Sequence, residues 1–301
     1  MQAPKPPAQT SAPAIQPGQS ASAVNSAALP SRFWAQLTTA DFARLQACGQ
    51  MQDVIAVLPL GATEQHGPHL PLQVDTAIAD GVIAQALAHL PTGLPVLFLP
   101  TQPVGLSPEH IRFAGTLTLQ AETVLRLWSD IGESVARTGV RKLVFFNAHG
   151  GHVGAMDLVA RQLRERCDLM VWSVNSFGLP VGDAVNGLFT PDEHRFGIHA
   201  GDTETSLMLA LHPAQVRMEL AQNFSSASQQ RAAQFEILGN GRSAKLGWQM
   251  QDYNADGAAG NAAAATAEKG QTLLAAMGQQ LALLLQEVAQ LPASTLVNRP
   301  R

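Results

Sequence analysis

The sequence lacks what several protein classes require. Its 301 residues include two cysteines, Cys48 and Cys167, which are too few for a disulfide framework and favour free thiols in a reducing compartment. No stretch approaches the ~18–20 consecutive apolar residues of a membrane span. The formal net charge is -4 and lysine and arginine form no long cluster, so a nucleic-acid surface is not indicated. These absences favour a cytoplasmic protein without a nucleic-acid or membrane partner.

The composition is that of a chain with a sizeable core. Apolar residues make up 46% of the sequence and charged residues 14%, which is typical of globular proteins. The first thirty residues are rich in Pro, Ala, Gln and Ser and contain no apolar segment of a secretory signal. We therefore predict a disordered tail over residues 1–32 and a single domain over residues 33–301.

Within the domain, apolar runs alternate with segments of helical spacing. The runs lie at 54–60, 96–99, 140–146 and 169–174, and the helical segments at 77–89, 121–137 and 155–166. Unbroken apolar strands separated by helices predict an α/β fold with a parallel sheet covered on both faces. Ligands of such sheets bind at the carboxyl ends of the strands, where we expect the functional residues.

Polar motifs follow these runs. LPLGATEQHGPHLPLQVDT, residues 58–76, carries Glu64, His66 and Asp75, and NAHGGH, residues 147–152, carries His149. Two carboxylates and two imidazoles that converge at one sheet edge suit Zn, Mn or Fe rather than a metal held by thiolates. The pattern therefore indicates a metal site.

A structural role for each histidine taken alone is the simpler interpretation, but their grouping opposes it. Seven of the nine histidines fall in four short loops punctuated by Gly and Pro. Buried carboxylates without a counter-ion repel each other, and a dication relieves that repulsion. Some residues keep two interpretations: His69 as a partner of a ligand, His152 as a helix cap, and Glu109 and His110 as substrate or metal contacts or as a polar surface turn.

These two motifs, with HAGDTETS at residues 199–206, in this order and spacing, resemble the creatininase (creatinine amidohydrolase) family. The resemblance implies a three-layer α/β/α fold with a mostly parallel central sheet, two divalent metal ions per chain and a homo-oligomer, commonly a hexamer. It also implies a role for each matching residue: Glu64 and His66 as ligands of separate metals, Asp75 as the bridging carboxylate, His149 as another ligand, His199 as a proton-transfer residue, and Glu204 as a further ligand or a second proton carrier.

One departure from the family pattern bears on the substrate. Creatininase itself carries a Tyr-Glu pair, whose glutamate binds a metal, where this sequence has Gly150 and Gly151. This pair, together with Ser107 and His110, gives our candidates for substrate contacts.

The leading hypothesis is hydrolysis of a C–N bond in a small amide such as creatinine by two Zn, Mn or Fe ions, which activate water and polarise the carbonyl. One alternative is a peptidase or formamide hydrolase of a cofactor or modified-peptide pathway. Another is a metal-stabilised binding protein without catalysis.

Overall fold

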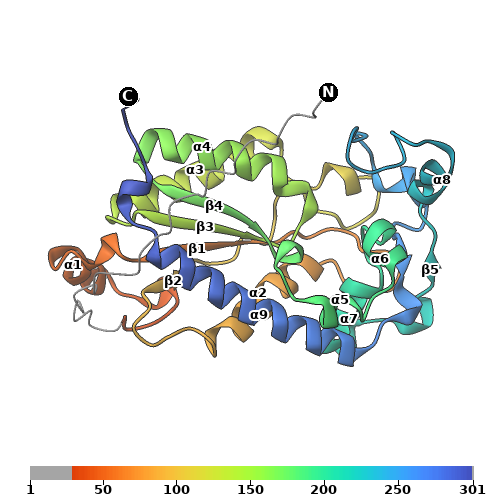
Figure 1. Ribbon diagram of the computed structural model, residues 1–301, viewed down its shortest axis with the longest axis horizontal. Helices are drawn as coiled ribbons and strands as arrows, with labels where there is room; N and C mark the ends of the chain where they lie inside the picture. Colours follow the sequence, from red (N-terminus) through yellow and green to blue (C-terminus); the bar gives the residue numbers. More distant parts are fainter. Residues whose placement is uncertain (1–28, 300–301) are drawn as a thin grey trace, which may run out of the picture.

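A four-stranded parallel sheet forms the centre of the computed structural model, which describes residues 29–299. The strands lie in the order β2-β1-β3-β4 (Figure 1). β1 pairs with β2 and β3, and β3 with β4, all in parallel, as the sequence predicts. Their bounds are β1 (Ile55–Leu60), β2 (Val96–Phe98), β3 (Lys142–Asn147) and β4 (Met170–Asn175).

Helices cover both faces of this sheet, which confirms the three-layer prediction (Figure 1). One face packs on α2 (Val74–Leu87) and α9 (Ala267–Gln290), and α7 (Asp202–Leu211) packs against these two helices. The opposite face packs on α1 (Thr39–Ala47), α3 (Ala121–Arg137) and α4 (Val153–Cys167). Successive strand residues point to opposite faces, so Ile55 and Val57 enter the first core, and Ala56 and Leu58 the second.

The segment after β4 shows no helical periodicity in the sequence, yet part of it is helical. It contains α5 (Asp183–Asn186) and α6 (Pro191–Phe196), both too short to show a periodic pattern. Thr190 caps α6 by accepting a hydrogen bond from the Glu193 backbone, and Pro191 suits the first helical turn.

The remaining elements lie with α5, α6 and α7 at one end of the sheet (Figure 1). They are β5 (Asn223–Phe224), α8 (Ala227–Gln234) and β6 (Gly260–Asn261), with β5 and β6 antiparallel. Within residues 29–299 no helix has both the length and the apolar composition needed to cross a bilayer. Residues 1–28 of the predicted tail lie outside the described residues. Arg32, at the end of that tail, donates a hydrogen bond to the Pro91 carbonyl at 2.6 Å.

Candidate metal centre

The five residues expected to hold metal come from four separate parts of the fold and meet beyond the carboxyl ends of the strands. Glu64 and His66 lie in the loop after β1, and His149 follows β3. Asp75 and Glu204 occupy the first turns of α2 and α7, where helix dipoles favour carboxylates. All except Glu204, which is partly covered, are buried.

Asp75 joins two groups of donor atoms. Its Oδ1 lies 3.6 Å from His66 Nε2, and its Oδ2 lies 3.6 Å from His149 Nδ1. Glu64 Oε1 is 3.2 Å from His149 Nδ1, and Glu204 Oε2 is 4.0 Å from His66 Nε2. Each oxygen of Asp75 therefore faces a different histidine with its own second carboxylate, which is the arrangement that a bridging carboxylate requires.

Backbone carbonyls fix which nitrogen of each histidine is free to bind. His66 Nδ1 donates to the Glu64 carbonyl oxygen at 3.0 Å, and His149 Nε2 donates to that of Leu106 at 2.9 Å. In the neutral rings the lone pairs then lie on His66 Nε2 and His149 Nδ1, the two atoms that face the carboxylates. The rings are thus oriented as metal ligands.

In the absence of metal, charge within the cluster shifts the pKa of both histidines upward. Burial opposes protonation of His66, but the negative charge of Asp75, with those of Glu204 and Glu64, raises its pKa to about 9. Burial likewise opposes protonation of His149, and Glu64 with Asp75 raises its pKa to about 10. Burial raises the pKa of Glu204 to about 7. The carboxylates therefore attract positive charge strongly, and metal ions can take the place of these protons.

The donor set fits divalent metal ions. Three buried atoms of the cluster, Glu64 Oε2, His66 Nε2 and Asp75 Oδ2, have no hydrogen-bond partner within the described residues. Leaving such atoms unpaired is costly, and coordination to a cation satisfies them. The donor atoms of Glu64, Asp75 and His149 lie within 4.8 Å of one another, as do those of His66, His199 and Glu204. Oxygen and imidazole donors suit Zn, Mn or Fe.

His199 is held next to this cluster by Gln65, a residue that the sequence analysis missed. His199 Nε2 donates to the Gln65 carbonyl oxygen at 2.7 Å, so the Nδ1 lone pair faces Glu64 Oε1 at 4.0 Å. The Gln65 amide donates to His110 Nδ1 at 2.7 Å, which leaves the His110 Nε2 hydrogen directed at Glu64 Oε1, 3.3 Å away. Gln65 lies between two predicted ligands in the sequence. Its contacts depend on how the loop folds, so no sequence motif indicated them.

A cleft of about 410 Å³ opens onto these groups. Its lining includes His110, Gly150, Gly151 and Trp248 beside Glu64, Asp75, His149, His199 and Glu204. Ser107, the remaining candidate for a substrate contact, is buried behind His149, with its Oγ 3.5 Å from Nε2, and does not line the cleft.

The family model described as "Creatininase: Creatinine amidohydrolase" matches residues 35–285. The chain belongs to the creatininase family. A mycofactocin precursor peptide peptidase of Mycobacterium tuberculosis (strain ATCC 25618 / H37Rv) is 41% identical over 169 residues, which cover 54% of this chain and 61% of that relative. This chain therefore spans less than two thirds of the length of that relative.

A creatinine amidohydrolase of Pseudomonas putida is 33% identical over 199 residues, 62% of this chain and 74% of that protein. A solved structure described as "Creatininase Mn" has a TM-score of 0.65 and 27% identity, and the match covers 85% of this chain and 98% of that one. These matches agree with the assignment to the creatininase family. The name of the solved structure indicates a manganese form of creatininase.

A carboxylate from a different loop lies beside the diglycine of this chain. Glu109 Oε1 lies 3.5 Å from His149 Nε2. A Cβ atom added at Gly151 would overlap both of these atoms, whereas one added at Gly150 would meet nothing within 4 Å. Glu109 thus occupies the space that a side chain at position 151 would need, and this favours a contact with the metal shell over a polar surface turn.

Two histidines of the motifs are not near a carboxylate of the cluster. His69 Nε2 hydrogen-bonds Thr205 Oγ1 at 2.9 Å, so it steadies α7. His152 occupies the N-cap position of α4, as one of its two interpretations predicts, but its side chain does not cap the helix. Its ring bonds elsewhere: Nδ1 lies 2.9 Å from Asn147 Oδ1, and Nε2 accepts from the Leu106 backbone N–H.

Glu193 in α6 is a second residue that the sequence analysis missed. It is buried, and its carboxylate accepts hydrogen bonds from the backbone N–H groups of Asn261 at 2.9 Å and Thr203 at 3.4 Å. These bonds tie α6 to β6 and to the start of α7. The turn that carries His199 lies between α6 and α7 in the chain. The turn is unusual, because Ala200 has a φ of 53°. Glu193 therefore holds the segment that presents His199 and Glu204.

We expect Glu193→Ala to lower turnover about tenfold or more, because small displacements of the reacting groups lower the reaction rate strongly. It also leaves two backbone N–H groups unpaired, each at a cost of ~1–3 kcal/mol of stability. Metal content per chain, kcat and thermal unfolding measure the effect. Asp192→Ala, an exposed neighbour in the same helix, is the matched control. Unchanged metal content and kcat in Glu193→Ala would show that this residue does not position the site.

Proposed function

We propose that this protein is a two-metal hydrolase that cleaves an amide bond in a short peptide. The observation that carries the proposal is Asp75, whose two oxygens face two histidines, each with its own second carboxylate, at the wall of an open cleft. Membership of a family of amide hydrolases supports the reaction class.

In this proposal Glu64, Asp75 and His149 would hold one ion, and His66, Asp75 and Glu204 would hold the other. When bound, such ions polarise the amide carbonyl and promote attack by water. The cleft lining includes both carboxylate arms, so substrate can reach them. This access opposes the alternative of a metal-stabilised binding protein, whose ligands would be closed off from solvent.

His199 is the proton carrier in this scheme. Its Nε2 hydrogen is committed to the Gln65 carbonyl, so Nδ1 is the atom that can accept a proton from the attacking water. Nδ1 can then return that proton to the nitrogen that leaves as the C–N bond breaks. Each cycle thus consumes one water and yields an acid and an amine, and the histidine ends as it began.

A peptide is favoured over a smaller amide by the space around the site. The cleft is about 410 Å³, and a second cavity of about 300 Å³ shares Glu204 and Ile198 with it. The match to a relative named for a peptide substrate supports this choice. Creatinine is the second candidate, because the family model and the Pseudomonas putida relative carry its name.

Metal removal tests the proposal. The purified protein is stripped with a chelator, reconstituted with Zn²⁺, Mn²⁺ or Fe²⁺, and assayed by mass spectrometry against short peptides, an N-formyl amide and creatinine. We expect two ions per chain and peptide cleavage that disappears with the metals and returns with them. Two bound ions without hydrolysis of any of these compounds would support the binding-protein alternative instead, and cleavage of creatinine alone would identify a creatininase.

A further inference from the structure

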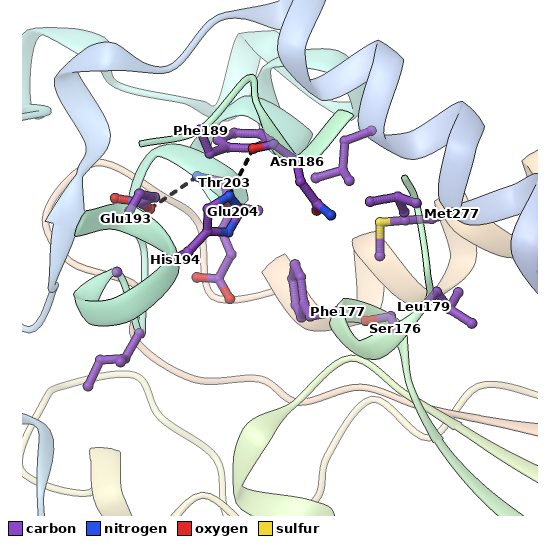
Figure 2. Close-up of a pocket in the computed structure, with 15 residues that line it drawn as sticks. Ser176, Phe177, Leu179, Asn186, Phe189, Glu193, His194, Thr203, Glu204 and Met277 are labelled. Atoms are coloured by element: carbon purple, nitrogen blue, oxygen red, sulfur yellow. Dashed lines mark hydrogen bonds between the residues drawn. The ribbon is translucent and has the colours of Figure 1, made fainter. Parts of the chain in front are cut away.

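The second cavity has an apolar wall built from segments far apart in the sequence. Figure 2 shows Phe177 and Leu179, which follow β4, and Met277 of α9 around an open space, with His194 and Glu204 on its other side. Val181, Phe189, Ile198 and Leu273 complete the apolar part of the wall. Its volume of about 300 Å³ lies at the lower end of the range found for small-molecule pockets.

The polar groups at the edge of this cavity are mostly engaged already. His194 Nε2 donates to the Asn186 carbonyl oxygen at 2.8 Å. Glu193 accepts the two backbone hydrogen bonds described above. Among the described residues that line the cavity there is no lysine or arginine, so nothing there would balance an anionic ligand. The cavity is therefore suited to an uncharged, mainly apolar group.

One polar group in the wall is free. Ser176 is fully buried, and its Oγ has no hydrogen-bond partner within the described residues. A buried hydroxyl without a partner is unfavourable, and a ligand that brings a hydrogen-bonding group to it removes that penalty. The complementary group is therefore bulky and apolar with one polar atom that can reach Ser176, as in the phenol of tyrosine.

The position of the cavity connects it to the chemistry. Glu204 lines both the cavity and the metal cleft, and so does Ile198. A peptide whose scissile amide lies in the cleft can thus place the side chain of a nearby residue in the cavity.

We propose that this cavity is a specificity pocket for a large aromatic side chain of the peptide substrate, with Ser176 Oγ as the partner of a polar group on that side chain. The inference rests on the proposed peptide hydrolysis, and it assigns the substrate preference to Phe177, Leu179 and Ser176, none of which is among the five predicted metal ligands.

Three kinds of acetylated pentapeptide test the pocket. One is all alanine, and in the other two a single tyrosine or a single phenylalanine replaces alanine at each position in turn. We expect the best tyrosine peptide to be cleaved with kcat/KM at least about tenfold above the all-alanine peptide, as burial of an aromatic ring predicts. Leu179→Trp, which fills the cavity, should reduce this advantage to near unity. Leu296→Trp, a half-buried leucine in a separate cavity beside α4, is the matched control and should change nothing.

Ser176→Ala separates the two parts of the pocket. It should abolish the preference for tyrosine over phenylalanine, expected to be about fivefold to tenfold for one hydrogen bond, and retain the preference for phenylalanine over alanine. Thermal unfolding shows whether each variant is folded. Phe177→Ala, which removes an exposed part of the wall, should reduce the preference for aromatic residues less than Leu179→Trp does.

Binding of N-acetyl-tyrosinamide to the metal-free protein, followed by saturation-transfer NMR, distinguishes the two possible failures. If wild type cleaves no peptide but binds this probe, and Leu179→Trp does not, peptide hydrolysis is wrong and the pocket stands. If wild type cleaves peptides without an aromatic preference, or Leu179→Trp keeps that preference, the specificity pocket is overturned while the proposed hydrolysis stands.

Discussion

Replacing Asp75 by asparagine is expected to lower turnover by about a thousandfold or more, since metal ions supply several kcal/mol of transition-state stabilisation in such sites. The asparagine side chain has the same shape, but it is neutral and only its oxygen can bind a metal. One of the two contacts, to His66 or to His149, would therefore be left without a bridging oxygen. We expect the metal content to fall from two ions per chain to one or fewer.

The matched control is Asp80→Asn, in the same helix. Asp80 is exposed and accepts a hydrogen bond from Thr101 Oγ1 at 2.6 Å, so its substitution tests the loss of a carboxylate from α2 without touching the cluster. Metal analysis and kcat are measured for both variants. If Asp75→Asn kept two ions and wild-type turnover, Asp75 would not be a bridge and the two-metal proposal would have to be abandoned.

Gly151→Ala is expected to have the second largest effect, a loss of about a hundredfold in kcat/KM, because ligand displacements of about an ångström cost that much. The added Cβ would overlap Glu109 Oε1 and His149 Nε2, and the Leu106 carbonyl oxygen lies 2.7 Å from it. That carbonyl orients His149 through the hydrogen bond to Nε2. The imidazole would have to move from the position in which it faces Glu64 and Asp75.

Gly150→Ala provides a control one residue away, because a Cβ there meets nothing within 4 Å. We expect it to retain metal content and most of the turnover. The double variant Gly151→Ala with Glu109→Ala removes one of the overlapping groups and should recover part of the activity lost in Gly151→Ala. Equal activity of the two single glycine variants would contradict the role given to the space beside Glu109.

The layout of the sheet could be predicted because each buried strand is a continuous apolar run. The observed β1 begins one residue after the predicted start, and α3 has the predicted bounds. The predicted metal ligands also come together, because the motifs follow strands whose carboxyl ends meet at one edge. By contrast, α5 and α6 have four and six residues, which is less than two turns and leaves no periodic signal.

The sequence by itself determined the fold class, the family and the identity of the groups that converge on the centre, since these depend on local periodicity and on motifs within short stretches. Only the tertiary structure decided how Asp75 divides its oxygens, that Glu109 fills the space beside Gly151, and that Glu193 holds the turn before α7 through Asn261, 68 residues away. It also placed the apolar cavity beside Glu204. These features arise from contacts between segments that are distant in the chain. Neither the spacing of residues nor the composition predicts which distant side chain will occupy a given space.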